Sequence, residues 1–381
     1  MKILFVDTLY SSVLEKIGFL KAPISGDTEE WLNSELNVNP LSSGPAYAEE
    51  LRARGHEVEV RYANAQRAQL AWVKSGTSYN FSQNWFWSNW QLISRIPLVG
   101  SWIYRNTAMT KIMVSQILNS KPDVVYFLNI NLLNSNIIRQ IKAVGITVVG
   151  QHASPLPPKS LYKGIDLIFS AHPDQVRQFK ENGISATYLP LAFTNHFGED
   201  SSAKLWSERS LDVTFVGTFG RHQKSTGPLL RAIAEKVNNL NIYTNSSISQ
   251  LKKLNLEKYY RGNAWGKAMY KVLADSKIAI NRHGEVAGGY AVNFRLFEAT
   301  GMGALLLTES ALNIKDLFEP EIEVLTYSSI PDAVEKIQQV LANPSKYEKV
   351  ANAGKERTQL NHTYKERVLV IEQALIMISS I

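Results

Sequence analysis

The segment KIAINRHGEVAGGYAVNFRLFEATGMGALLLTE, residues 277–309, decides the fold class of this chain. It begins with an apolar run, crosses a loop with three glycines, and continues into an amphipathic stretch and a second apolar run. Such a succession predicts strand, helix and strand in a parallel sheet that helices cover on both faces. The loop after the first strand then lies at the carboxyl end of the sheet, where open α/β folds bind their ligands.

The same alternation recurs along most of the chain. Apolar runs predict strands at 2–7, 56–62, 123–129, 146–151, 165–171, 186–193, 211–217, 240–244, 257–262, 277–283, 303–309 and 322–327. Amphipathic stretches predict helices at 46–55, 108–120, 134–145, 173–183, 227–237, 268–276, 293–302 and 330–343. The polar stretch 194–210 has no apolar period and predicts a linker between domains.

We therefore expect an α/β protein with two Rossmann-like, doubly wound parallel-sheet domains that face a cleft. The expected N-terminal domain covers residues 1–195 and the C-terminal domain covers residues 211–355. The final segment, 356–381, has a helical pattern and is expected to pack back on the first domain.

Composition narrows the classes of function. The chain of 381 residues carries a formal charge of +7, but its basic residues are scattered, so we expect no nucleic-acid partner. It has no Cys, which excludes disulfides, thiolate zinc sites and a Cys nucleophile and fits a reducing compartment. The N-terminus MKILFVDTLY lacks the features of a signal peptide, and no apolar run approaches the ~20 residues that span a bilayer. We expect a cytoplasmic protein.

An aromatic insert interrupts the first domain at 72–105, and it holds five of the eight Trp residues. One interpretation is a pair of inserted helices whose aromatic side chains pack on the first domain. The other is a surface that binds an acceptor or makes peripheral contact with the inner face of a membrane, because Trp among Lys and Arg suits sugar stacking and the lipid headgroup zone. The sequence leaves both open.

The second domain opens with FVGTFGRHQKSTG, residues 215–227, between a predicted strand and a predicted helix. Gly217 permits close approach of the backbone, and Arg221 and Lys224 suit a bound diphosphate. An ordinary solvated turn is the alternative for this pattern alone. The stretch has neither a Walker A motif nor a complete dinucleotide-binding fingerprint, which argues against an ATPase and against a dehydrogenase.

The opening segment offers a second candidate. A helix that starts near Asn293 directs its free N–H groups at a phosphate, and Glu298 follows about one turn later. Because a carboxylate repels phosphate, Glu298 is better suited to accept hydrogen bonds from paired hydroxyls such as those of ribose. A surface Glu that the helix dipole favours is the alternative.

These segments resemble GT-B glycosyltransferases, especially the bacterial spore-maturation (CgeB-like) group. VNFRLFEATGMGALLLTE (292–309) resembles the donor-nucleotide segment, and FVGTFGRHQK (215–224) resembles the basic diphosphate loop. YYRGNAWGKAMYKVLADSKIAINR (259–282) resembles the stretch with the base-binding loop, and AGKERTQLNHTYKERV (353–368) resembles the closing helices. The resemblance is good over residues 211–370, whereas the first domain matches in strand order and at His152.

The resemblance implies transfer of a sugar from a nucleoside diphosphate to a glycan, glycolipid or other acceptor, with neither metal nor further cofactor. It implies that Arg221 and Lys224 neutralise the leaving diphosphate, that Arg295 assists, and that Glu298 holds the ribose. His152 stands where many retaining members carry a His near the donor sugar, although a His after a strand is often only a structural hydrogen bonder. The other donor-binding residues expected are Gly217, Arg261, Trp265, Arg282, Tyr290, Asn293 and Phe294.

One departure from the family concerns the donor sugar. Retaining members carry Glu, seven residues and a second Glu, and Tyr290 stands at the position of the first acid here, with Glu285 nearby. The stereochemical outcome therefore stays open, and an inverting route would need a base such as His152 or Asp7. A nucleotide-sugar epimerase and a non-catalytic nucleotide-sugar-binding protein of the same fold are the alternative functions.

Overall fold

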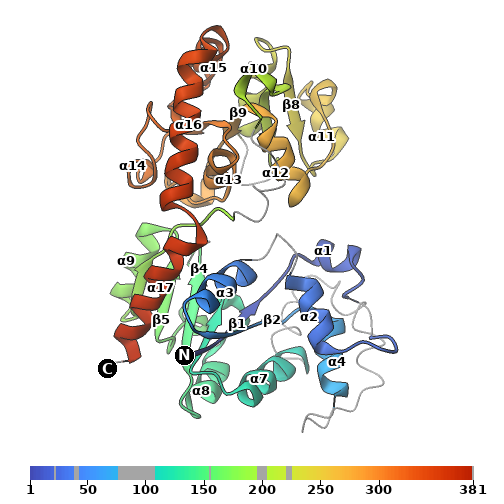
Figure 1. The fold of residues 1–381 in the computed structure, drawn as a ribbon, viewed down its shortest axis with the longest axis vertical. Helices are drawn as coiled ribbons and strands as arrows, with labels where there is room; N and C mark the ends of the chain where they lie inside the picture. The colour runs from blue at the N-terminus through green and yellow to red at the C-terminus, as the bar shows by residue number, and fades with distance from the viewer. Residues whose placement is uncertain are drawn as a thin grey trace.

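The computed structural model describes residues 1–20, 23–37, 43–75, 108–153, 156–194, 204–219 and 225–379, which form two α/β domains (Figure 1). The strands of the N-terminal domain are β1 Lys2–Asp7, β2 Glu57–Tyr62, β3 Val124–Phe127, β4 Thr147–His152, β5 Leu167–Ser170 and β6 Ala186–Tyr188. Its helices are α1 Ser11–Lys16, α2 Glu29–Asn37, α3 Gly44–Ala53, α4 Gln66–Lys74, α7 Ala108–Ser120, α8 Ser135–Lys142 and α9 Pro173–Glu181.

The C-terminal domain repeats this alternation. Its strands are β7 Leu211–Val216, β8 Leu240–Tyr243, β9 Ser276–Asn281, β10 Leu305–Glu309 and β11 Leu325–Tyr327. The helices are α10 Thr226–Ala234, α11 Ile248–Lys253, α12 Lys267–Ala274, α13 Arg295–Gly301, α14 Ile314–Leu317, α15 Ile330–Ala342 and α16 Pro344–Asn361, followed by α17 Tyr364–Ser379. None of the described helices combines the length and the apolar character needed to span a bilayer.

Both sheets are parallel, as the apolar strand patterns predict. In the described residues the first sheet has the order β2-β1-β3-β4-β5-β6, and the second has the order β11-β10-β9-β7-β8. The central strands β1, β3 and β4 are buried almost throughout, which explains their continuous apolar sequence. The predicted fold class of two doubly wound parallel-sheet domains is confirmed.

The strand predicted at 257–262 is wrong. Glu257–Tyr259 form a 3₁₀ turn, and Tyr260 makes only an isolated bridge to Ile242 in β8. The side chain of Tyr259 turns inward, and its hydroxyl donates a hydrogen bond to the carbonyl of Ala234 at 2.8 Å. Burial of this aromatic ring therefore favours a turn here over an extended pairing.

The chain crosses between the domains at two places that lie side by side. Leaving α16, it enters α17, whose Val368, Ile371 and Leu375 are buried in the core of the N-terminal domain (Figure 1). On the other crossing, Phe193 packs so tightly on α13 that a Cβ on Gly301 would lie 2.5 Å from its ring. Arg367 joins the crossings because its guanidinium donates hydrogen bonds to the carbonyls of Pro190, Leu191 and Asn361.

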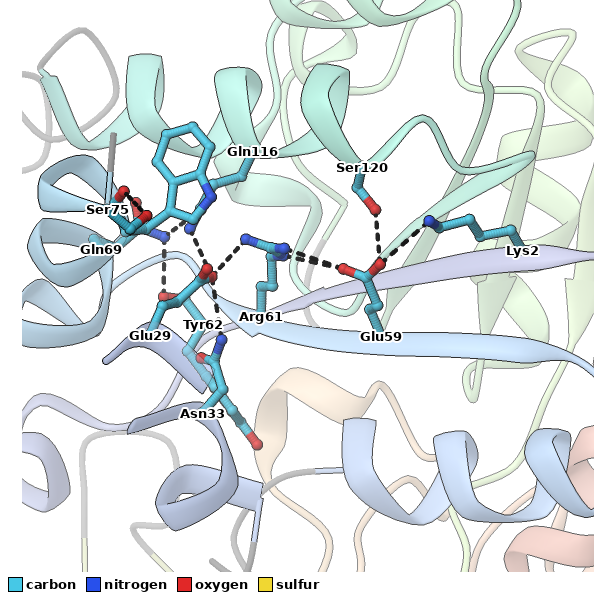
Figure 2. Close-up of polar contacts among 11 residues, drawn as sticks. Lys2, Glu29, Asn33, Glu59, Arg61, Tyr62, Gln69, Ser75, Gln116 and Ser120 are labelled. Atoms are coloured by element: carbon cyan, nitrogen blue, oxygen red, sulfur yellow. Dashed lines mark hydrogen bonds and ion pairs between the residues drawn. The ribbon is translucent and has the colours of Figure 1, made fainter. Parts of the chain in front are cut away.

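The aromatic insert predicted at 72–105 lies outside the described residues except for its first four positions, of which Trp72 is buried. The helices on either side of it, α4 and α7, are joined to β2 and α2 by a chain of polar side chains (Figure 2). Glu29 accepts hydrogen bonds from Arg61, from Asn33 at 3.2 Å and from Gln116 at 3.2 Å. Beyond Arg61, Glu59 continues the chain to Ser120 and Lys2.

The pKa values of the two glutamates in this row of polar side chains shift in opposite directions. Burial raises the pKa of Glu29, and the positive charge of Arg61 opposes that effect. Burial would also raise the pKa of Glu59, but Arg61, Ser120 and Lys2 outweigh it and lower the pKa. Both carboxyl groups are thus held by partners within one domain.

Candidate active site

A cavity of about 890 Å³ opens between the two domains, a volume typical of small-molecule sites. On the C-terminal side it is lined by the carboxyl ends of β7 and β9, the loop after β9, and the region where α13 begins. On the N-terminal side it is lined by Tyr10 after β1, the first turn of α3 and Ala153 after β4. The two sheets thus direct their carboxyl ends at one shared space, where doubly wound folds bind ligands.

Most of the predicted donor-binding residues meet in this cavity. The lining residues include Gly217, Trp265, Arg282, Asn293, Phe294, Arg295 and Glu298. They come from four separate segments, and the parallel order β9-β7 brings the strand ends together. The predicted phosphate-binding side chains Arg221 and Lys224 lie outside the described residues.

Glu298 is the only acidic side chain that the described part of the C-terminal domain contributes to the cavity. Its carboxylate pairs with Arg295, three residues earlier on α13, at 2.8 Å, and 14% of the Glu298 side chain is exposed. Burial raises the pKa of Glu298, and Arg295 lowers it only in part. Such a carboxylate gains from further hydrogen-bond donors, which a ligand with free hydroxyls supplies.

Arg295 is held in a fixed position. Its Nε donates to the carbonyl of Val216 at 3.3 Å, and its Nη1 lies 2.9 Å from the sulfur of Met269. Because Val216 is the last residue of β7, Arg295 connects α13 to the strand that precedes the predicted phosphate loop. The guanidinium therefore lies between Glu298 and the end of β7.

A second polar group lies at the end of β9. Burial lowers the pKa of His283, so this ring is neutral at pH 7. Its Nε2 lies 3.0 Å from the carbonyl of Glu309, which can only accept, so Nε2 carries the proton. Nδ1 is then an acceptor for the amide of Asn293 at 3.2 Å, and the same amide nitrogen donates to the carbonyl of Arg282 at 3.2 Å.

This arrangement fixes the orientation of Asn293 and leaves its Oδ1 as an acceptor. That oxygen is buried and has no partner among the described residues, and the same holds for Nη1 of Arg282 and the hydroxyl of Thr226. All three side chains belong to residues that line the cavity. Buried polar atoms without partners are costly, so a ligand or water that supplied partners to them would be bound favourably.

Two predicted site residues, Arg261 and His152, and the candidate base Asp7 are not among the residues that line the cavity. Arg261 donates hydrogen bonds to Asn241 and to the carbonyl of Lys258. His152, at the end of β4, is buried with its ring edge-on to Phe179 at 6.2 Å. Asp7, at the end of β1, accepts a hydrogen bond from the backbone N–H of Thr8 at 2.7 Å.

Tyr290, which stands at the position of the family's first acid, contacts the other domain. Its ring lies 4.7 Å from that of His172, which follows β5 in the N-terminal domain. The Nε2 of His172 is 3.1 Å from the carbonyl of Ala287, in the loop that leads to Tyr290. This part of the glycine-containing loop therefore forms a contact between the domains.

The structure adds residues that sequence reasoning missed. Tyr10 and Ser43 line the cavity from the N-terminal domain, and Tyr364 lines it from α17 and donates a hydrogen bond to Ser43 at 3.0 Å. For Tyr10 a signal existed, because it follows the predicted strand 2–7 at the carboxyl end of the sheet. For Tyr364 the sequence offered no such signal, because this residue reaches the cavity only when α17 packs on the N-terminal domain. Among the described residues, no cluster of three or more His, Asp and Glu could hold a metal ion.

Comparisons with known proteins agree with this architecture. Residues 222–373 match the protein family described as glycosyl transferase-like. No curated protein sequence matches the chain.

Among solved structures, the sucrose-phosphate synthase of Thermosynechococcus elongatus is similar with a TM-score of 0.61, 10% identity, and coverage of 100% of this chain and 99% of that one. Anabaena HepE in complex with UDP-glucose is similar with a TM-score of 0.60, 13% identity, and full coverage of both chains. The lipopolysaccharide outer core galactosyltransferase WaaB is similar with a TM-score of 0.56, 15% identity, and coverage of 99% of both chains.

At these identities the structural neighbours show the fold, and the matched segment covers the wall of the cavity that carries Glu298. The predicted glycosyltransferase class is confirmed at the level of the fold and of this segment. The chain has the GT-B fold of glycosyltransferases, and its C-terminal half carries a glycosyl transferase-like segment.

Proposed function

We propose that this protein is a glycosyltransferase that transfers a sugar from a nucleoside diphosphate to a glycan or glycolipid acceptor without a metal ion. The observation that carries the proposal is the partly buried pair of Arg295 and Glu298, which lies in the interdomain cavity and within the family segment. The proposal places the chain in the CgeB-like group, on the residues 292–309, and in the cytoplasm, which the absence of Cys favours.

The proposed roles follow from charge and position. Glu298 accepts hydrogen bonds from the ribose hydroxyls, and Arg295 keeps its carboxylate oriented. Arg221 and Lys224 neutralise the charge that develops on the departing diphosphate, which is electrostatic stabilisation of the transition state. Gly217, directly after β7, leaves room for the phosphates to approach the backbone.

UDP is the first nucleotide to test. HepE, which shares the fold over its full length, has been crystallised with UDP and with UDP-glucose. A uridine nucleotide in the cavity would place its ribose beside Glu298 and its diphosphate toward the loop after β7.

Isothermal titration calorimetry with UDP, GDP and ADP tests the donor site. We expect one nucleoside diphosphate to bind with a dissociation constant below the millimolar range, and Arg221→Ala to weaken it. If none of the three binds, the proposal fails. An unchanged circular dichroism spectrum shows that the variant is folded.

A separate experiment distinguishes transfer from the alternatives. The protein is incubated with the nucleotide sugar whose nucleotide binds, and sugar products are separated by chromatography. Transfer of the sugar to an acceptor, or its slow transfer to water, supports a transferase if the Glu298→Ala variant lacks this activity. A new isomer of the nucleotide sugar without acceptor would instead indicate an epimerase, and binding without any turnover would indicate a non-catalytic protein.

A further inference from the structure

Two exposed aromatic side chains from opposite domains meet at the cavity. The rings of Tyr10 and Trp265 lie 6.3 Å apart between centroids, at an angle of 57°. Tyr10 is 65% exposed and Trp265 is 45% exposed, and both line the cavity. Large aromatic side chains that are exposed inside a ligand cavity have apolar area available for a ligand.

The backbone on both sides of Tyr10 is anchored. Leu9 is buried, and its backbone N–H and carbonyl both bond to the side chain of Asn64, at 3.1 and 2.6 Å. On the other side, the carbonyl of Tyr10 accepts hydrogen bonds from Val13 and Leu14 in the first turn of α1. Hydrogen bonds thus hold the backbone on both sides of Tyr10, whereas its ring is exposed.

The backbone on both sides of Trp265 is also anchored. Ala264 before it is buried in the core of the C-terminal domain, and Gly266 after it has a φ of 52°, which favours glycine. The carbonyl of Gly266 accepts from the N–H of Tyr270 in the first turn of α12. The backbone that carries each ring is therefore anchored, whereas both side chains remain exposed.

The two rings belong to different halves of the proposed reaction. Trp265 lies four residues before Met269, which contacts Arg295, so it is on the donor side of the cavity. Tyr10 comes from the other domain, after β1. On the proposed function, the donor's diphosphate and ribose are held by the C-terminal domain, so a ring on the opposite wall is available for the second substrate.

We propose that Tyr10 is a substrate-contacting residue that stacks on a pyranose ring of the acceptor, opposite Trp265. A pyranose presents an apolar face of C–H groups that fits an aromatic ring. A ligand ring between two aromatic rings needs them about 7–8 Å apart, given contacts of roughly 3.5–4.0 Å on each face. At 6.3 Å and 57° the empty pair is too close and too tilted to hold a sugar between parallel faces, so the exposed Tyr10 side chain must rotate about its anchored backbone to stack on the acceptor.

Saturation-transfer difference NMR tests this inference without a known acceptor. The probes are methyl β-glucopyranoside, methyl β-galactopyranoside and methyl 2-acetamido-2-deoxy-β-glucopyranoside, titrated in the presence of saturating UDP. We expect at least one to bind wild-type protein through its ring C–H protons. Tyr10→Ala should weaken that binding roughly three- to tenfold, whereas Tyr10→Phe, which keeps the ring, should restore it.

The controls separate the possible outcomes. Ile24→Ala removes a similarly exposed apolar side chain that does not line the cavity and should leave glycoside binding unchanged. If Tyr10→Ala weakens UDP binding and spares the glycoside, the ring contacts the nucleoside and the inference is wrong. It is also wrong if no glycoside binds the wild type in the presence of UDP, or if Tyr10→Ala binds it equally well. Failure of UDP itself to bind overturns the proposed function instead.

Discussion

Two partly buried Glu–Arg pairs in this molecule are nearly identical in exposure and differ in their surroundings. In the N-terminal domain, Glu29 and Arg61 have side chains that are 16% and 17% exposed. In the cavity, Glu298 and Arg295 have side chains that are 14% and 16% exposed. Burial raises the pKa of both glutamates, and the partner arginine opposes the shift in both.

The surroundings separate the two pairs. Glu29 also accepts hydrogen bonds from Asn33 and Gln116, and Arg61 also binds Glu59, so the partners of this pair are protein groups (Figure 2). Glu298 lines a cavity between domains, and Arg295 is its ion-pair partner there. A raised carboxyl pKa thus accompanies both pairs, and only the open space beside Glu298 points to a ligand.

The largest expected effect concerns the stability of the first pair. Arg61→Met leaves Glu29 and Glu59 without their shared cation, and for this partly buried pair the loss should cost about 3 kcal/mol, the low end of the range for buried pairs. We expect the free energy of unfolding of the N-terminal domain to fall by this amount in urea titrations followed by Trp fluorescence. Arg177→Met, which breaks an exposed pair with Asp174, is the matched control and should change it by less than about 1 kcal/mol.

A double variant sharpens this prediction. Arg61→Met combined with Glu29→Leu removes one of the two carboxylates that lose their cation, and Glu59 keeps Lys2, so part of the lost stability should be recovered. Additive losses in the two single variants and the double variant would mean that the pair has no net coupling. A loss below about 1 kcal/mol for Arg61→Met would show that the chain of polar residues is not structural.

The next effect concerns binding by the second pair. Glu298→Ala removes a charged acceptor from the ribose, and hydrogen bonds to charged groups contribute about 1.5–3 kcal/mol, so the dissociation constant of UDP should rise roughly 10- to 150-fold. Calorimetry measures it directly. Glu29→Gln, the matched change in the other pair, should leave UDP binding unchanged, and a change of less than threefold for Glu298→Ala would remove Glu298 from the nucleotide site.

The smallest effect is a pH dependence of stability. Because the pKa of Glu298 is higher in the folded state than its ordinary 4.5, the folded protein binds more protons than the unfolded chain just above that pH. Ionisation of Glu298 therefore costs stability as pH rises through this window. Glu298→Gln, which does not titrate, should be more stable than the wild type at neutral pH, with the difference disappearing near pH 4.5.

Thermal unfolding at a series of pH values measures this difference. A Glu298→Gln variant that is less stable than the wild type at neutral pH would contradict it, because the ion pair with Arg295 would then outweigh the cost of burial. Saturating UDP should reverse the order, since only the carboxylate provides the charged acceptor to the ribose.

Sequence reasoning predicted the elements that have strong local patterns. The strand at 2–7 and the helix at 108–120 lie where the structure has β1 and α7, because alternation and amphipathic period are local properties. The short helix α2 was missed, although it places Glu29 against Arg61. Its pairing joins residues 32 positions apart, which no local pattern encodes.

The candidate site shows the same division. Glu298 and Arg295 could be predicted because both lie in one helix turn after a glycine-containing loop. The contact of Tyr290 with the N-terminal domain could not be predicted. The Tyr290 ring packs against His172, which lies 118 positions earlier in the sequence. Tyr10 and Trp265 are likewise 255 positions apart and meet only when the domains face each other.

By itself the sequence determined two parallel α/β sheets and singled out the segment 292–309, since apolar periodicity and short-range motifs depend on neighbouring residues. Only the tertiary structure decided that Glu298 borders a cavity shared by both domains, whereas Glu29 is enclosed by protein partners. It also decided that Tyr290 contacts the N-terminal domain and that Tyr10 faces Trp265. These features arise from packing between distant segments, and the free energy of such contacts has no counterpart in the local pattern of the chain.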